Sequence, residues 1–194
     1  SHGYSIWTCM PGSEVLGDAV MLASESDKAV IFVGNNEKIE AESFDRSTLK
    51  LPPDIENMII RIAEQNPETI VVIQAGSVIE MSSWIHKVKG VVFAGYAGQE
   101  GGAAVAEILF GVVNPSGKTA ETFPMCLEDT PAYPYYPGDG FTVSYKEDLM
   151  VGYRHYDSIN KEVLFPFGHG LSYTCLLYTS DAADDLLCVD LGWR

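Results

Sequence analysis

The stretch AVIFV at residues 29–33 decides the fold, together with two later runs of the same kind, IVVI at residues 70–73 and VVFA at residues 91–94. Each run is continuously apolar and rich in β-branched residues rather than alternating with polar ones. That pattern is typical of short strands covered on both faces of a sheet. The three runs therefore predict three buried strands.

The segments between these strands show the periodicity of helices. Between residues 54 and 65, apolar side chains recur at positions i, i+3, i+4, i+7 and i+8, which predicts one apolar helix face. Asp54 follows two prolines and is the expected N-cap. A second helix is expected upstream, ending before Asp27, and a third after residues 98–102, ending at Gly111. This alternation predicts an α/β fold, a mostly parallel sheet flanked by helices (an α/β sandwich).

The amino-acid composition changes after Asn114. Proline, tyrosine and glycine become frequent there, as in YPYYPG at residues 133–138 and FPFGHG at residues 165–170. Such a composition favours turns over regular elements. We expect a loop region with short strands that wraps over the rest of the fold.

Composition limits the classes of partner. The chain has 194 residues, with 12 Lys and Arg against 27 Asp and Glu, and a formal net charge of −15. This charge repels phosphate backbones, so we expect no nucleic-acid partner. No apolar run reaches the roughly 18–20 residues of a membrane span, and the first residues show no signal-peptide pattern, so we expect no membrane partner either. The cysteines lack zinc-site spacing, and we expect no metal and no cofactor. The cellular compartment stays open.

Residues 34–46 form an acidic loop directly after the first strand. It carries four carboxylates, on Glu37, Glu40, Glu42 and Asp45. The carboxyl ends of strands are where open α/β sheets bind ligands. With Phe44 and Arg46, this loop would offer a proton donor, an aromatic platform and a counter-charge. Residue types alone fit a solvated loop better, one whose charges only hold its shape.

A resemblance changes that balance. The loop reads VGNNE at residues 33–37, EAESFDR at residues 40–46 and LP at residues 51–52. This series resembles the V-G-x-N-E…E-x-E-G-[FY]-D-R…L-P signature of glycoside hydrolase family 3. More segments resemble the family in the same order, at residues 75–81, 96–102, 109–111, 114–118, 122–124, 151–157 and 165–173. The similarity spans residues 28–174.

The resemblance implies one lobe of a retaining, β-glucosidase-like enzyme. In this family a TIM-like barrel supplies an aspartate nucleophile and the α/β sandwich supplies a general acid/base, which falls on Glu42. Retaining hydrolysis needs both carboxyl groups, about 5–5.5 Å apart. No residue here matches the nucleophile motif. We therefore expect a missing N-terminal barrel as partner, a β-linked glucoside or oligosaccharide as substrate, and a fragment that is inactive alone.

Smaller details of the loop follow from the same comparison. Phe44, Asp45 and Arg46 become weaker candidates for substrate binding or loop shaping. Ser43 stands where the family usually has glycine, and if that position needs a positive φ, serine is strained there.

Two alternatives remain open. In the first, the chain is a non-catalytic carbohydrate-binding or scaffold lobe that docks the barrel. In the second, it is a nucleotide-binding α/β domain in which residues 98–102 hold a phosphate group. That glycine-rich segment lacks the GxGxxG spacing and is more typical of a tight strand-to-helix turn.

The last twenty residues resemble the translation of a transposase adapter used to prepare short-read sequencing libraries, beginning with CLLYTSDAAD at residues 175–184. We therefore predict a truncated family 3 C-terminal α/β-sandwich domain over residues 1–174 and a non-native, disordered tail over residues 175–194.

Overall fold

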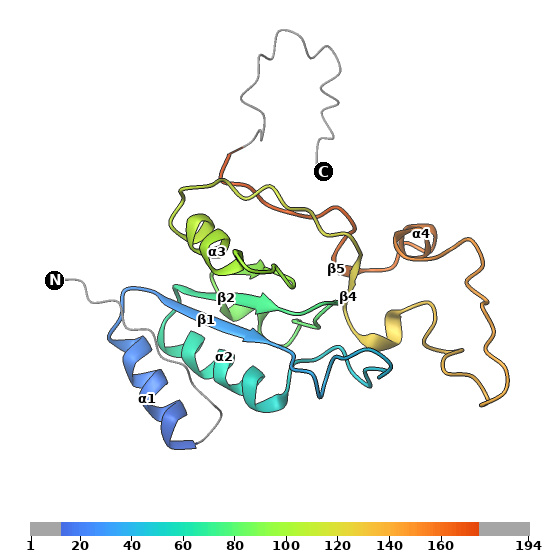
Figure 1. Cartoon of the computed structure of the whole chain (residues 1–194), viewed down its shortest axis with the longest axis horizontal. Helices are drawn as coiled ribbons and strands as arrows, with labels where there is room; N and C mark the ends of the chain where they lie inside the picture. The colour runs from blue at the N-terminus through green and yellow to red at the C-terminus, as the bar shows by residue number, and fades with distance from the viewer. Residues whose placement is uncertain (1–12, 175–194) are drawn as a thin grey trace, which may run out of the picture.

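The chain folds as a parallel sheet between helices (Figure 1), in a computed structural model that describes residues 13–174. The main elements are α1 (Ser13–Ser24), β1 (Ala29–Gly34), α2 (Pro53–Gln65), β2 (Thr69–Gln74), the 3₁₀ turn η1 (Ile85–Lys87), β3 (Gly90–Phe93) and α3 (Gly101–Leu109). The strands lie in the order β1-β2-β3, and both pairs are parallel. The predicted α/β class is therefore confirmed, while the predicted tail at residues 175–194 lies outside the described residues.

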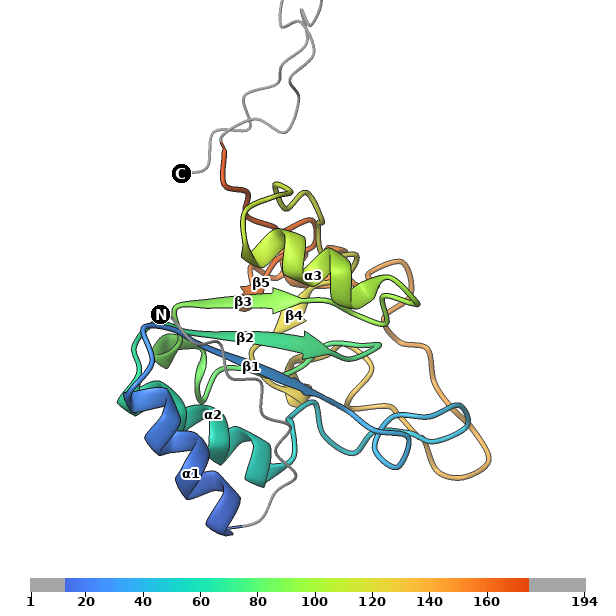
Figure 2. The same cartoon turned by 60° about the vertical axis from the view of Figure 1, so that its left-hand side comes forward.

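The helices cover the two faces of the sheet unequally. Helices α1 and α2 lie side by side on one face, and α3 lies on the other face beside β3 (Figures 1 and 2). The core lies between α1, α2 and the sheet, where Ile59, Val71 and Ile73 are fully buried, and it extends to Trp84 before η1. Ile59 belongs to the apolar face of α2, as the periodicity predicts, and Val71 and Ile73 to the inner face of β2.

Burial on both faces was expected for every strand and holds for the central strand, β2, while no residue of β3 is fully buried and β1 is open on one face. Ile31 and Val33 point into the core, but Val30 is 43% exposed and Phe32 is 57% exposed. The reason is the strand order. Strand β1 is an edge strand, and α3 covers the sheet only near β3 (Figure 2).

The start of α2 also differs from the expectation. The N-cap is Pro52 rather than Asp54, and the helix begins at Pro53. The carbonyl of Pro52 accepts the N–H groups of Ile55 and Glu56 at 2.9 and 3.0 Å. Proline suits the first helical position because its φ is already helical and its missing N–H would have no partner there.

The remaining described residues form the expected loops and short strands. Strands β4 (Phe123–Pro124) and β5 (Val163–Phe165) pair antiparallel, the turn η2 (Leu127–Asp129) follows β4, and a short helix, α4 (Tyr153–Ser158), was not predicted. Phe123 lies edge-on to Phe93 and to Phe165, with ring centroids 5.3 and 5.9 Å apart. These aromatic contacts attach the loop region to β3.

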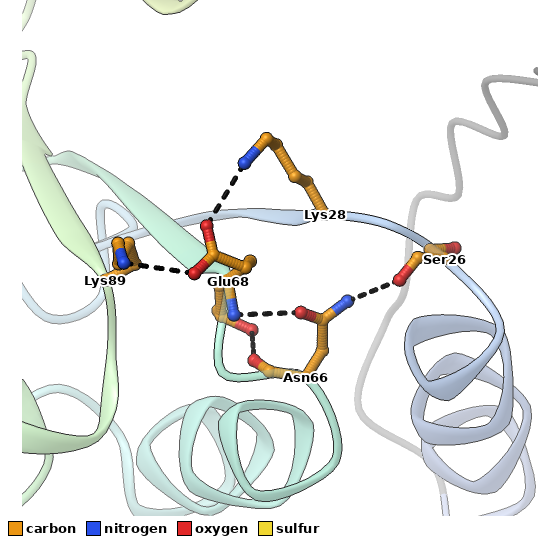
Figure 3. A network of polar contacts seen from close by, with 6 residues as sticks. Ser26, Lys28, Asn66, Glu68 and Lys89 are labelled. Atoms are coloured by element: carbon orange, nitrogen blue, oxygen red, sulfur yellow. Dashed lines mark hydrogen bonds and ion pairs between the residues drawn. The ribbon is translucent and has the colours of Figure 1, made fainter.

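A polar network closes the amino edge of the sheet, opposite the acidic loop (Figure 3). The amide of Asn66, which is 5% exposed, donates to the carbonyl oxygens of Ala23 and Ser26, both at 2.9 Å. Its Oδ1 accepts the N–H of Glu68, whose carboxylate pairs with Lys28 and with Lys89. One side chain thus ties the end of α1 to the turn before β2.

No helix among residues 13–174 has the length and apolarity needed to cross a membrane.

Candidate functional site

The acidic loop leaves the sheet at a point where only glycine fits. A Cβ atom on Gly34 would lie 2.0 Å from the backbone oxygen of Gln74 on β2, far inside van der Waals contact. The next residue, Asn35, donates its N–H to that same oxygen at 3.3 Å. Because the two strands are this close, the loop starts from a fixed position at the carboxyl edge of the sheet.

The first half of the loop folds back on itself. The carbonyl oxygen of Asn36 accepts the N–H groups of Ile39 and Glu40, both at 2.9 Å. The amide of Asn35 donates to Oε2 of Glu40 at 2.8 Å, and Oε1 of Glu40 packs against Gly76, where a Cβ would lie only 2.5 Å away. Glu40 is therefore turned inward and shapes the loop.

Glu42, Ser43 and Phe44 form the tip of the loop. All three are exposed, Phe44 by 74%, and the N–H of Phe44 donates to the carbonyl of Ala41 at 3.3 Å. Ser43 has φ +69°, a left-handed conformation that glycine adopts without strain and serine does not. The expectation of strain at Ser43 is therefore confirmed.

Arg46 fixes the far side of the tip. Its Nη1 donates to Oγ of Ser77 at 2.7 Å and to the carbonyl of Val78 at 3.0 Å, in the segment after β2. Burial lowers the pKa of the guanidinium, and the nearby charge of Glu40 opposes this shift. Among the described residues, Nε and Nη2 have no hydrogen-bond partner, so the guanidinium keeps two donors at this edge.

Asp45 makes a contact that the sequence analysis missed. Its Oδ2 accepts a hydrogen bond of 2.7 Å from the phenol of Tyr136, and both side chains are exposed. This carboxylate raises the pKa of Tyr136. The repeated tyrosines of residues 133–136 are a signal for a surface role, but nothing in the sequence pairs Tyr136 with Asp45.

A cavity of about 920 Å³ opens beside the loop, between β1, α2 and the turn before α3. Phe32, Asn35, Arg61, Gln74 and Tyr96 contribute to its walls, and Glu42 does not. The structure therefore brings Glu42 together with Phe44, Asp45 and Arg46 on the loop but keeps it outside this cavity.

The glycine-rich segment before α3 is a tight turn, as the sequence analysis favours. Gly98 has φ +70°, and its carbonyl accepts the N–H of Gly101 at 3.2 Å. Within residues 13–174, no group of three His, Cys, Asp or Glu side chains is placed to hold a metal ion.

Comparison with known proteins identifies the family. The family model described as "Glycosyl hydrolase family 3 C-terminal domain" matches residues 9–173. Over 184 residues, 95% of this chain, the sequence is 46% identical to the thermostable β-glucosidase B of Acetivibrio thermocellus. It is 44% identical over 161 residues to the probable β-glucosidase I of Aspergillus flavus. The chain spans 24% and 19% of the length of these two relatives.

Solved structures agree with this result. The β-glucosidase of Kluyveromyces marxianus in complex with glucose superposes with a TM-score of 0.81 at 37% identity, over 87% of this chain and 20% of that one. A family 3 β-glucosidase from Bifidobacterium adolescentis gives the same TM-score at 40% identity, over 84% of this chain and 24% of that one. Sequence and fold agree, and the chain belongs to glycoside hydrolase family 3, whose C-terminal domain it matches.

Proposed function

We propose that this chain supplies the general acid/base of a retaining β-glucosidase-like enzyme, and that Glu42 is the residue. The observation that carries the proposal is the exposed position of Glu42 at the tip of a loop whose two stems are tied to the sheet. A carboxyl group placed in this way is open to a second domain, while the stems limit how far it moves. The matching position in the family signature gives independent support.

The proposed reaction has two steps. In the first, the Glu42 carboxyl gives its proton to the leaving glycosidic oxygen while an aspartate of an N-terminal TIM-like barrel attacks the anomeric carbon. In the second, the Glu42 carboxylate takes a proton from the water that releases the sugar. The substrate would be a β-linked glucoside or oligosaccharide, and the chain without the barrel would be inactive.

The neighbouring residues would support this chemistry in different ways. Phe44 presents an exposed ring beside Glu42, suited to stacking on the sugar or aglycone that leaves. Asp45 would hold the tip through its hydrogen bond with Tyr136, and Arg46 would hold it through its hydrogen bond with Ser77. The domain over residues 1–174 and the non-native tail over residues 175–194 stay predictions.

A chimeric enzyme tests the proposal. Residues 9–173 would replace the matching segment of the Acetivibrio thermocellus β-glucosidase, because this chain spans only 24% of that protein and the rest of its length would supply the proposed barrel. In this chimera, Glu42→Gln should lower kcat/KM for an alkyl glucoside about 100-fold or more, because its leaving group needs a proton. The value for a dinitrophenyl glucoside, whose leaving group departs as an anion, should change little.

The matched control is Glu37→Gln, an exposed carboxylate in the same loop, which should leave both substrates unaffected. In Glu42→Gly, kcat for the dinitrophenyl glucoside should fall although kcat/KM does not, because the second step loses its general base. Azide should restore this kcat, since removal of a catalytic carboxylate leaves room for a small nucleophile. Equal losses for both substrates, without azide rescue, would contradict the proposal and favour a scaffold lobe.

A further inference from the structure

We propose that Tyr136 is a positioning residue, which holds the tip of the acidic loop in the orientation that Glu42 needs. The inference rests on the proposed role of Glu42 and adds to it a second segment of the chain. Tyr136 lies 91 positions after Asp45, in the tyrosine- and proline-rich region that the catalytic motif does not include.

The two stems of the loop are anchored without Tyr136. On the first side, Asn35 bonds to the backbone of Gln74 and to Glu40. On the second side, Arg46 bonds to Ser77, and the carbonyl of Leu49 accepts the N–H of Glu80 at 2.9 Å. The segment between them, residues 41–45, carries Glu42.

That tip has one external anchor. Among residues 13–174, the only hydrogen bond from residues 41–45 to another part of the chain is the 2.7 Å contact between Asp45 Oδ2 and the phenol of Tyr136. Asp45 is three residues from Glu42 on the same short tip, so a change of the backbone at Asp45 would also displace the proposed acid. Figure 2 shows the two loops side by side, away from the sheet.

Tyr136 is itself held on a braced turn. The carbonyl of Ala132 accepts the N–H groups of Tyr135 and Tyr136 at 2.9 and 3.0 Å. Prolines at positions 131, 134 and 137 restrict the backbone on both sides of the phenol. Upstream, Asp129 in η2 pairs with Lys161 at 2.7 Å, which joins this turn to the residues after α4. These contacts attach the turn that carries Tyr136 to the rest of the loop region.

Solvent exposure limits what this hydrogen bond contributes to folding. Both partners are exposed, and water replaces the bond readily if the phenol is removed. The position of the acid is more sensitive than the stability of the fold, because a small displacement of an acid from the leaving oxygen slows proton transfer strongly. The expected effect therefore lies in catalysis and depends on whether the leaving group needs a proton.

The experiment uses the chimeric enzyme with Tyr136→Phe. We expect kcat/KM for the alkyl glucoside to fall roughly five- to twentyfold. The reason is that the variant loses the hydrogen bond to the Asp45 carboxylate that orients the acid. The value for the dinitrophenyl glucoside should stay within about twofold, because that substrate does not need the proton.

Tyr135→Phe is the matched control, because it also removes one phenol oxygen and keeps the ring that lies under the Lys146 ammonium. It should leave both substrates unchanged. Asp45→Ala should reproduce the effect of Tyr136→Phe, and the double variant should be no slower than either single one.

Equal losses on both substrates, no loss at all, or the same loss in Tyr135→Phe would each overturn the role of Tyr136. The Glu42→Gln result is read separately. If Glu42→Gln shows its selective loss and Tyr136→Phe does not, only the positioning role fails. If Glu42→Gln shows no selectivity, the proposed function fails first.

Discussion

The guanidinium of Arg46 donates one hydrogen bond to the hydroxyl of Ser77 at 2.7 Å and another to the carbonyl of Val78 at 3.0 Å. This contact joins the end of the acidic loop to the segment after β2, 31 positions away in the sequence. The loop is therefore attached to both β1, from which it starts, and the neighbouring strand.

Replacing this guanidinium should cost stability even where the charge is kept. Arg46→Lys retains a cation, but the shorter lysine side chain does not place its nitrogen where Nη1 bonds both acceptors. We expect the free energy of unfolding to fall by about 1–2 kcal/mol, measured by urea denaturation of the chain. Arg61→Lys, an exposed arginine on α2, should change it by less than about 0.5 kcal/mol. Equal effects at both sites would contradict the anchoring role of Arg46.

Ser43→Gly should stabilise the chain. The φ of +69° at this position strains serine by roughly 1–2 kcal/mol, and glycine removes that strain at an entropic cost of about 0.5–1 kcal/mol. The expected net gain is therefore about 0.5–1 kcal/mol in the free energy of unfolding. Ser47→Gly, where no positive φ is present, should be neutral or destabilising in the same assay. A loss of stability in Ser43→Gly would show that the strain is absent.

Asn66→Ala should destabilise the fold strongly. The substitution leaves two backbone carbonyls and the N–H of Glu68 without their partner, and Asn66 itself is almost fully buried. We expect a loss of about 2–4 kcal/mol in the free energy of unfolding. Lys28→Gln removes only an exposed ion pair from the same network and should cost less than about 0.5 kcal/mol. Comparable losses would mean that the buried amide is not the centre of the network.

The ion pair between Asp129 and Lys161 should make stability depend on pH. The hydrogen bond from Lys161 lowers the pKa of Asp129, so the folded chain binds this proton less readily than the unfolded chain, whose aspartates have a pKa of about 3.9. The stabilisation is therefore present above that value and is lost as the pH falls through the lower, folded pKa.

The measurement compares the chain with its Asp129→Asn variant by urea unfolding at several pH values. The chain should be the more stable of the two near neutral pH, and the difference should shrink towards about pH 3 and below. Lys161→Met should add no further loss in the Asp129→Asn background, because the pair is already broken. A difference that does not vary with pH would exclude the ion pair as its cause.

Local sequence predicts the elements of this fold well. The three apolar runs appear as β1, β2 and β3 with bounds within a few residues of those expected, because apolar side chains at these spacings can be buried in few other ways. The start of α2 was misplaced by a short distance. The predicted cap was an aspartate side chain, whereas the chain uses the backbone carbonyl of Pro52.

Sequence motifs also located the acidic loop, because the series around Glu42 is long and its pieces keep their order. They could not predict how β1 is covered, since Val30 and Phe32 are exposed through their place at the sheet edge. Coverage depends on which strand becomes central, and the apolar run is the same in either position.

The sequence by itself therefore determined the α/β class, the family and the loop that carries Glu42, since each follows from local patterns and from their order along the chain. Tertiary structure alone decided that Glu40 turns inward against Gly76, that Arg46 reaches Ser77 and that Tyr136 holds Asp45. These contacts join residues 31 to 91 positions apart, and they form only when β1, β2 and the tyrosine-rich turn are packed in place.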